Sequence, residues 1–194
     1  KISNIIKIQE ALHEKKISEI AQTIKDKKAK VVLISGPSSS GKTTFAKKLE
    51  IHLRVLGLKP YTISTDNYFV DRDKTPLKEN GNPDYDSINS IDYKLLQTHI
   101  NKLILGEEVD IPKYNFVTGK KEKGRKIYLN SNGLVIVEGI HGLNPILSVD
   151  IPDEIKYKVY VSALSQVNID NINRIPTRDT RLIRRIVRDS QFRG

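Results

Sequence analysis

The 194-residue sequence contains no cysteine and no methionine. Without cysteine the chain can form no disulfide, bind no metal through thiolates and use no thiol nucleophile, and this absence favours a cytoplasmic protein. No apolar run approaches the roughly 20 residues of a membrane span and no signal peptide is visible, so we predict no membrane association. Because position 1 is not Met, we expect that it is not the natural start of the protein.

Apolar periodicity predicts strands that alternate with helices, which indicates an α/β fold with a mostly parallel sheet. Ser90 is expected to cap a helix, and residues 70–90 are expected to form a long polar loop. Residues 1–30 are interpreted as a helical extension or linker, and residues 31–194 as one domain. The predicted helices are 2–14, 17–27, 44–56, 90–105 and a segment from about 179. The predicted strands are 31–35, 60–65, 134–138, 157–161 and a hairpin of 109–117 with 126–129.

Residues 36–43 read Gly-Pro-Ser-Ser-Ser-Gly-Lys-Thr and match the phosphate-loop pattern G-x-x-x-x-G-K-[ST]. A predicted strand precedes the motif and a predicted helix follows it, as the pattern requires. Glycines let the backbone wrap a phosphate chain, and the helix N-terminus adds a positive partial charge. Lys42 would reach the β- and γ-phosphates of a nucleoside triphosphate, and the Thr43 hydroxyl would bind Mg²⁺. The predicted phosphate-binding residues are Gly36, Ser38, Ser39, Ser40, Gly41, Lys42, Thr43 and Thr44.

The chain is strongly basic, with a formal net charge of +10 at pH 7 and a pI near 9.6. Basic clusters over residues 113–126 and 174–193 carry much of this charge. Such clusters can mark a nucleic-acid surface, but a nucleotide-binding protein also needs positive charge around phosphates, and most lysines fit solvated surface charge. We therefore do not predict nucleic acid as a partner.

Two acidic residues follow predicted strands. Asp66 lies where parallel sheets bind their ligands, and there a carboxylate can accept a proton from an attacking hydroxyl or hold Mg²⁺ through water. Glu138 ends an apolar strand, as does the Walker B carboxylate near the metal. Ordinary alternatives stay open, namely an Asx-turn before Asn67 for the first residue and a strand-end charge for the second.

Other candidate residues are weaker when taken alone. Asp86 in the long loop reads as a solvated acid, and Tyr114 and Phe116 either line an apolar pocket or belong to the core. The four histidines show no metal-ligand spacing.

Residues 31–194 resemble the uridine kinase family within the phosphoribulokinase/uridine kinase group. Five motifs carry the resemblance in order, at residues 36–44, 64–69 (Ser-Thr-Asp-Asn-Tyr-Phe), 111–116 (Ile-Pro-Lys-Tyr-Asn-Phe), 138–140 (Glu-Gly-Ile) and 179–189 (Asp-Thr-Arg-Leu-Ile-Arg-Arg-Ile-Val-Arg-Asp). Phrases at 140–145 and 173–177 look like bacterial nucleoside (uridine) kinases joined to an N-terminal TGS domain, which would explain residues 1–30. The resemblance implies a P-loop NTPase-type fold with a small β-hairpin insertion and an Arg-rich helical lid.

The resemblance implies ATP-dependent phosphorylation of a nucleoside 5′-hydroxyl, with Mg²⁺ accompanying ATP. Asp66 would be the catalytic base beside Lys42, and Thr43 and Glu138 would hold the metal. The implied nucleoside-binding residues are Asp86, Tyr114, Phe69, Phe116 and Arg181. The implied lid residues are Arg181, Arg184 and Arg188.

The chain departs from the family at three places. Tyr68-Phe69 inverts the family's Phe-Tyr, which displaces or removes a hydroxyl. Gly119 stands where uridine–cytidine kinases carry a base-reading histidine, so we expect weak base selectivity, or a preference other than uridine over cytidine. The chain ends at Gly194 near the end of the lid helix, so we expect an incomplete domain.

Two other functions remain open from the sequence. The chain could phosphorylate another small hydroxyl substrate, such as a phosphorylated sugar or pantothenate, or it could be a regulatory module that binds ATP or RNA without catalysis. The acceptor, the preferred donor and a homo-oligomeric state are not determined by the sequence.

Overall fold

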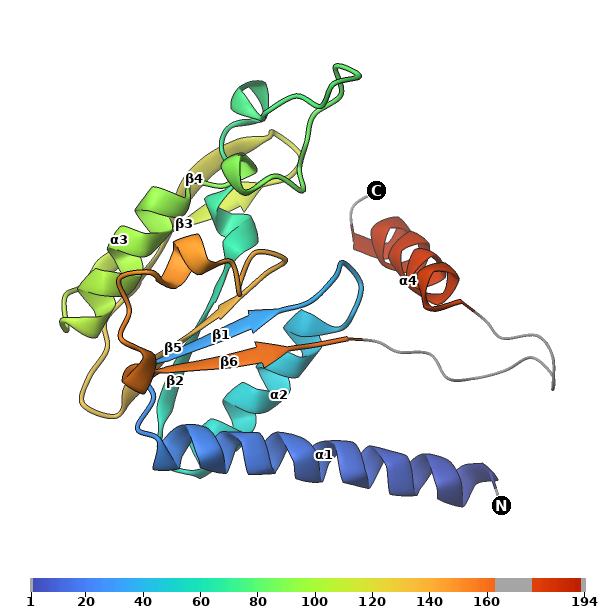
Figure 1. Cartoon of the computed structure of the whole chain (residues 1–194), viewed down its shortest axis with the longest axis vertical. Coiled ribbons are helices and arrows are strands. Elements are labelled where there is room, and N and C mark those ends of the chain that lie inside the picture. Colours follow the sequence, from blue (N-terminus) through green and yellow to red (C-terminus); the bar gives the residue numbers. More distant parts are fainter. Residues whose placement is uncertain (1, 163–175, 193–194) are drawn as a thin grey trace.

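The computed structural model describes residues 2–162 and 176–192 (Figure 1). Its central sheet has four parallel strands in the order β2 (Lys59–Ser64), β5 (Gly133–Glu138), β1 (Val31–Ser35) and β6 (Lys156–Tyr160). Every residue of β1 and β5 is buried, as expected of parallel strands that are covered on both faces. The predicted α/β fold with a parallel sheet is confirmed.

Helices and a two-stranded hairpin cover this sheet. Helix α4 lies apart from the sheet and beside the loop that follows β1 (Figure 1). The predicted hairpin is present, but its second strand begins at residue 120 instead of 126, because backbone pairing holds together an exposed, charged strand that has no apolar pattern. These elements are α1 (Ile2–Asp26), α2 (Lys42–Val55), α3 (Tyr93–Ile104), α4 (Thr177–Phe192), β3 (Val109–Asn115) and β4 (Lys120–Ile127).

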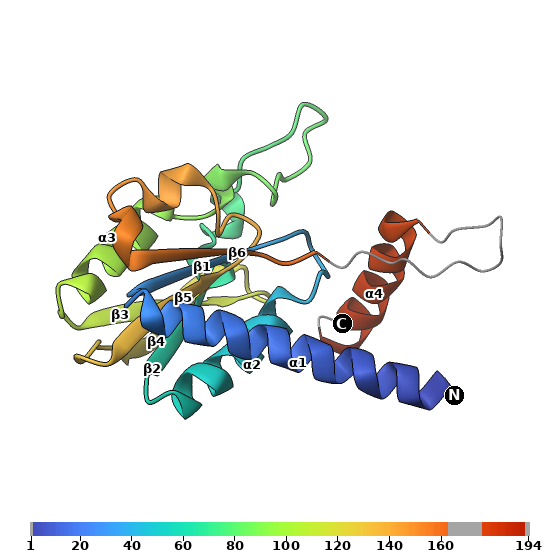
Figure 2. The same ribbon diagram turned by 60° about the horizontal axis from the view of Figure 1, so that its bottom comes forward.

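Alternate residues of β1 point to opposite faces of the sheet, so two hydrophobic cores form. Val32 and Ile34 pack with α1 and α2, which lie side by side in Figure 2. Val31 and Leu33 belong to the second core, together with α3 and the hairpin. Both cores pack against the strands, whose carboxyl ends carry the candidate site.

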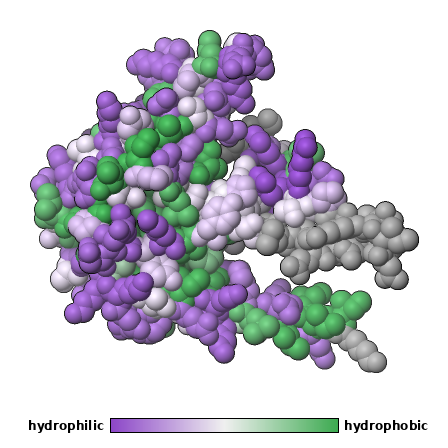
Figure 3. All heavy atoms as spheres, viewed as in Figure 1, coloured by the Kyte–Doolittle hydropathy of each residue, from purple (hydrophilic) through white to green (hydrophobic). Residues whose placement is uncertain are grey.

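Helix α1 is one continuous helix and not the predicted pair. Lys15 and Lys16, which separate the two predicted helices, are good helix formers, and neither Gly nor Pro interrupts the segment. Its second half is anchored by Ile17, Ala21 and Ile24 in the core shared with α2. Its first half projects from the domain, and Figure 3 shows apolar residues gathered on it. The division between residues 1–30 and 31–194 stays a prediction.

Helix α3 begins two residues later than the predicted cap implies, because Asp92 is its N-cap instead of Ser90. The Asp92 carboxylate accepts a hydrogen bond from the Leu95 N–H (3.1 Å). Ser90 is fully buried and its hydroxyl donates to the carbonyl oxygens of Tyr85 and Ser87, so it serves the preceding loop. Among the described residues, no helix is both long and apolar enough to cross a bilayer.

Candidate active site

The loop between β1 and α2 has the backbone that the glycine motif predicts. Gly36 has a φ of +155°, and a Cβ there would come within 2.0 Å of the Val161 carbonyl oxygen. Gly41 has a φ of +99° and precedes α2, whose N-terminus has no side-chain cap. Its first N–H groups and its positive dipole end are therefore free to bind an anion such as phosphate. Within the described residues, the buried hydroxyls of Ser39 and Ser40 have no hydrogen-bond partner. Both hydroxyls can therefore form hydrogen bonds with a bound molecule.

A cavity of about 350 Å³ lies against this loop. Its volume is within the range of small-molecule sites. The cavity brings together parts of the chain that are distant in sequence, from the phosphate loop to helix α4. It is lined by Ser38, Ser39, Gly41, Lys42, Thr43, Thr44, Asp66, Phe69, Tyr85, Asp86, Glu138, Gly139, Ile140, Arg184, Arg185 and Arg188.

Lys42 is the first residue of α2 and lines this cavity. Its ammonium group donates to the Pro37 carbonyl oxygen (3.0 Å), which holds the side chain across the loop. Burial lowers the pKa of Lys42, and the negative charges of Glu138 and Asp66 oppose that shift. The two carboxylates thus favour the charged form of Lys42 in a partly buried site. Because water screens charges less there, the ammonium group would act more strongly on a phosphate.

Glu138 and Thr43 form the candidate metal site. The Thr43 hydroxyl donates to the Glu138 carboxylate (3.3 Å), and Glu138 is only 5% exposed. Burial raises the pKa of Glu138, and a hydrogen bond from Ser64 partly opposes the shift. In the part of the chain that the structure describes, no group of three or more His, Cys, Asp or Glu side chains is placed to hold a metal ion by itself. Two oxygen ligands fit Mg²⁺, which is held by one or two protein groups together with substrate phosphates and water.

Asp66 lies in a 3₁₀ helix (Thr65–Tyr68) that directly follows β2. The Ser64 hydroxyl caps this turn by accepting from the Asp66 N–H (3.4 Å), which leaves the Asp66 carboxylate on the cavity wall. Its charge acts on both Lys42 and Glu138. A Cβ at Gly139 would lie 1.8 Å from the Thr65 hydroxyl, so glycine is needed where β5 passes this turn.

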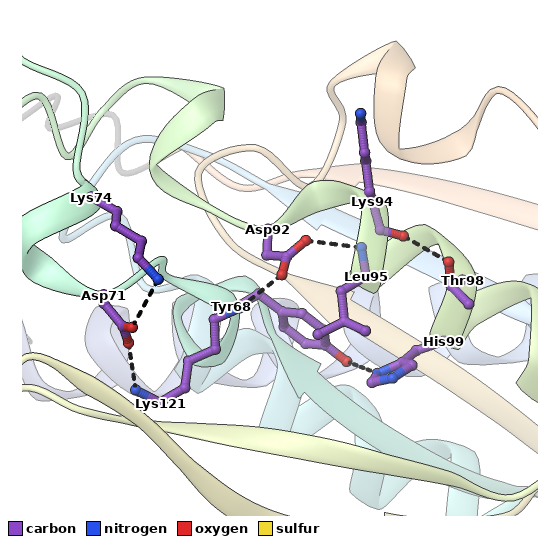
Figure 4. Close-up of polar contacts among 9 residues, drawn as sticks. All are labelled: Tyr68, Asp71, Lys74, Asp92, Lys94, Leu95, Thr98, His99 and Lys121. Carbon is purple, nitrogen blue, oxygen red and sulfur yellow. Dashed lines mark hydrogen bonds and ion pairs between the residues drawn. The ribbon is translucent and has the colours of Figure 1, made fainter.

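Tyr68 anchors the turn that carries Asp66 (Figure 4). Its hydroxyl hydrogen-bonds to His99 Nδ1 (2.9 Å), and its carbonyl oxygen accepts from the Asp92 N–H (2.7 Å). Burial raises the pKa of the Tyr68 hydroxyl. The inverted Tyr-Phe pair therefore moves the hydroxyl into the core and puts Phe69 on the cavity wall.

Four aromatic rings form a cluster that begins at the cavity wall. Phe69 contacts Tyr114 and Tyr85, with ring centroids 5.4 Å and 6.3 Å apart, and Tyr114 contacts Phe116 at 5.2 Å. Asp86 lines the cavity beside Tyr85. Sequence reasoning missed Tyr85, although its place next to Asp86 was the available signal. A flat ring that entered the cavity would meet Phe69 and Tyr85, the two members of the cluster that line it.

Helix α4 brings arginines to the cavity. Arg181 Nε donates to the Ser38 carbonyl oxygen (3.0 Å). Arg184 and Arg188, which the sequence predicted as lid residues, line the cavity together with Arg185, which it did not predict. Arg181 thus contacts the phosphate loop, and its expected contact with the nucleoside stays a prediction, as does the closure of α4 as a lid.

The chain is similar in sequence to known proteins. The family model described as the phosphoribulokinase/uridine kinase family matches residues 31–194. Uridine kinases of Halobacterium salinarum and Mycoplasma pneumoniae are 28% and 32% identical to the chain, over 83% and 84% of it. The chain spans 63% and 68% of the length of these two relatives.

Solved structures are similar as well. A structure described as that of a possible uridine kinase from Bacillus stearothermophilus superposes with a TM-score of 0.62 at 25% identity, covering 86% of this chain and 90% of the other. The residues matched by the family model, 31–194, include the phosphate loop, the Asp66 turn, the hairpin and β5. The chain belongs to the phosphoribulokinase/uridine kinase family.

Proposed function

We propose that the chain is the kinase part of a nucleoside kinase that transfers the γ-phosphoryl group of ATP to the 5′-hydroxyl of a nucleoside. One observation carries the proposal: a single cavity joins the phosphate loop to Asp66, Asp86 and the aromatic cluster. That arrangement supports a single site in which a phosphoryl donor would lie on the loop, with Asp66 as base and aromatic rings for a flat acceptor. Uridine kinases among the relatives support the acceptor class.

In this mechanism the phosphate-loop N–H groups and Lys42 bind the β- and γ-phosphates and stabilise the charge of the transition state. The Thr43 and Glu138 oxygens would hold Mg²⁺, which supplies charge neutralisation on those phosphates. Asp66 orients the acceptor hydroxyl and takes its proton as the bond to phosphorus forms. Asp86 accepts hydrogen bonds from the ribose hydroxyls.

The arginines of α4 complete the site. Arg184, Arg185 and Arg188 line the cavity, where their charges would meet the phosphates, and closing of this helix would exclude water. Exclusion of water favours transfer to the nucleoside over hydrolysis of ATP. We also propose that the protein is cytoplasmic, which the absence of cysteine supports. The sequence at residues 140–145 supports a link to an N-terminal TGS domain.

The test is one coupled assay of ADP formation with Mg·ATP and a panel of acceptors. The panel holds the common ribo- and deoxyribonucleosides, a phosphorylated pentose and pantothenate. Acceptor-dependent ADP formation with a ribonucleoside supports the proposal, and the product is identified as a 5′-monophosphate by mass spectrometry. Turnover with the sugar phosphate or pantothenate alone, or ATP binding without acceptor turnover, would contradict it.

A further inference from the structure

The turn of the β3–β4 hairpin has no room for a side chain at residue 119. Gly119 has a φ of +70°, and a Cβ built on it would lie 2.8 Å from the Cβ of Arg72 and 2.9 Å from its Nε. The Arg72 N–H also donates to the Gly119 carbonyl oxygen (2.9 Å). Arg72, from the long loop after β2, therefore occupies the space that a side chain at residue 119 would fill.

The Arg72 guanidinium is fixed against the aromatic cluster. One of its terminal nitrogens donates to the Phe116 carbonyl oxygen (2.5 Å), and the group also hydrogen-bonds to the Tyr114 hydroxyl. The backbone beside it is pinned as well, because the Lys121 N–H donates to the Asp71 carboxylate (3.3 Å; Figure 4). This hydrogen bond is also the main reason why the pKa of Asp71 is lowered.

The same cluster continues to the cavity. Tyr114 and Phe116 both contact Phe69, with centroids 5.4 Å and 6.2 Å apart, and Phe69 lines the cavity next to Asp66 and Asp86. A nucleoside whose hydroxyls meet those two carboxylates would extend its base toward the cluster. To contact the guanidinium, the base would have to extend past Phe69 to Tyr114 and Phe116, which do not line the cavity themselves.

We propose that Arg72 is the residue that selects the base, and that it replaces the side chain missing at Gly119. This inference rests on the proposed nucleoside kinase function. A guanidinium has five N–H donors and no acceptor, and its contacts with Phe116 and Tyr114 use only some of these donors. The remaining donors favour a base with a ring carbonyl, as at position 4 of uracil. Cytosine carries an amino group at that position, and an amino group is itself a donor and cannot accept these hydrogen bonds.

With Arg72 in this role, the expected base selectivity differs from the one that Gly119 alone implies. A glycine there implies weak selectivity, whereas Arg72 implies a preference for uridine over cytidine. Arg72 is exposed, which limits the effect, since water can partly satisfy an unpaired donor. We expect about a tenfold preference, well below the discrimination of a fully buried polar site.

The experiment measures kcat/KM for uridine, cytidine and the riboside of pyrimidin-2-one, which lacks any substituent at position 4. Arg72→Gln is expected to lower the uridine value about tenfold and to bring the uridine-to-cytidine ratio close to one. Arg72→Lys keeps the charge without the planar fork and is expected to lose most of the preference too. The riboside without a 4-substituent should be used equally by wild type and by both variants.

The matched control is Arg54→Gln, the same chemical change at an exposed ion pair on α2. It should leave all three substrates unchanged. A uridine-to-cytidine ratio in Arg72→Gln within threefold of wild type would overturn the inference, as would an equal loss on the unsubstituted riboside, which would indicate a structural role. If wild type phosphorylates none of the three but uses a purine ribonucleoside, the inference about Arg72 fails and the proposed function stands. If it phosphorylates no ribonucleoside at all, the proposed function itself fails. Turnover of nucleosides with an unchanged ratio refutes only the role of Arg72.

Discussion

Replacement of Asp66 by asparagine tests the central step of the proposed mechanism. The amide keeps the size of the side chain and can still accept a hydrogen bond, but it cannot take a proton. A general base contributes about a hundred- to ten-thousandfold to a rate, which corresponds to about 2.7–5.4 kcal/mol of transition-state stabilisation. We expect kcat to fall by that factor while KM for the nucleoside and for ATP changes little.

Removal of the Asp66 charge would also change the pKa values of two neighbouring groups. The Asp66 charge raises the pKa of Lys42 and that of Glu138. Without it, the pKa of Lys42 should fall somewhat further and the pKa of Glu138 should fall toward its ordinary value. Lys42 keeps its contact with Pro37 and the charge of Glu138, so ATP binding should survive, and this separates the loss of the base from the loss of the phosphate site.

The assay is steady-state ADP formation over a range of nucleoside concentrations, with ATP binding measured separately by fluorescence of a nucleotide analogue. The matched control is Asp153→Asn, which removes an exposed carboxylate that pairs with Lys156 (3.0 Å) away from the cavity. The control should keep wild-type kcat. A kcat of Asp66→Asn within threefold of wild type, or a loss confined to KM, would refute the role of Asp66 as the base.

Three further changes test the rest of the site. Lys42→Ala should lower kcat by about a thousandfold, the scale of removing a preorganised charge, while thermal unfolding shows an intact fold; near-normal turnover would exclude the phosphate-loop assignment. Asp86→Ala should weaken binding of ribonucleosides by about tenfold or more through lost charge-assisted hydrogen bonds, with a much smaller effect on 2′-deoxyribonucleosides in the same titration; equal losses would contradict contact with the ribose. Because burial raises the folded-state pKa of Glu138, its carboxyl group lowers stability as pH rises from its ordinary pKa through the raised one. Glu138→Gln should therefore gain more in Tm at pH 8 than at pH 4 while losing activity, and a Tm difference independent of pH would show that Glu138 is not desolvated.

The local signals in the sequence identified the phosphate-loop half of the candidate site. A strand, a glycine loop and a helix form within some 25 consecutive residues, and only glycine can hold the backbone of Gly36 and Gly41. The apolar runs of β1 and β5 likewise predicted buried parallel strands, because both faces must be covered. In each case the information lies in residues that are adjacent in the chain.

Other local predictions failed where two signals competed. Ser90 looked like a helix cap, yet its hydroxyl is used by the preceding turn and Asp92 caps α3. The strand over 120–127 has no apolar period, since it is held by backbone pairing at an exposed edge. The periodic spacing of apolar residues indicates which face of an element is buried. It therefore gives little information about an element that has no buried face.

The order of the strands, β2-β5-β1-β6, is what places Asp66 and Glu138 beside the phosphate loop, and no short stretch of sequence contains it. The role of Gly119 was equally hidden. The sequence shows only that a side chain is missing there, whereas the fold shows that Arg72, from a loop almost fifty residues earlier, fills its space. The sequence by itself determined the chemistry that the chain carries and the family to which it belongs. Only the tertiary structure decided which groups meet, because packing joins residues whose separation along the chain carries no signal of contact.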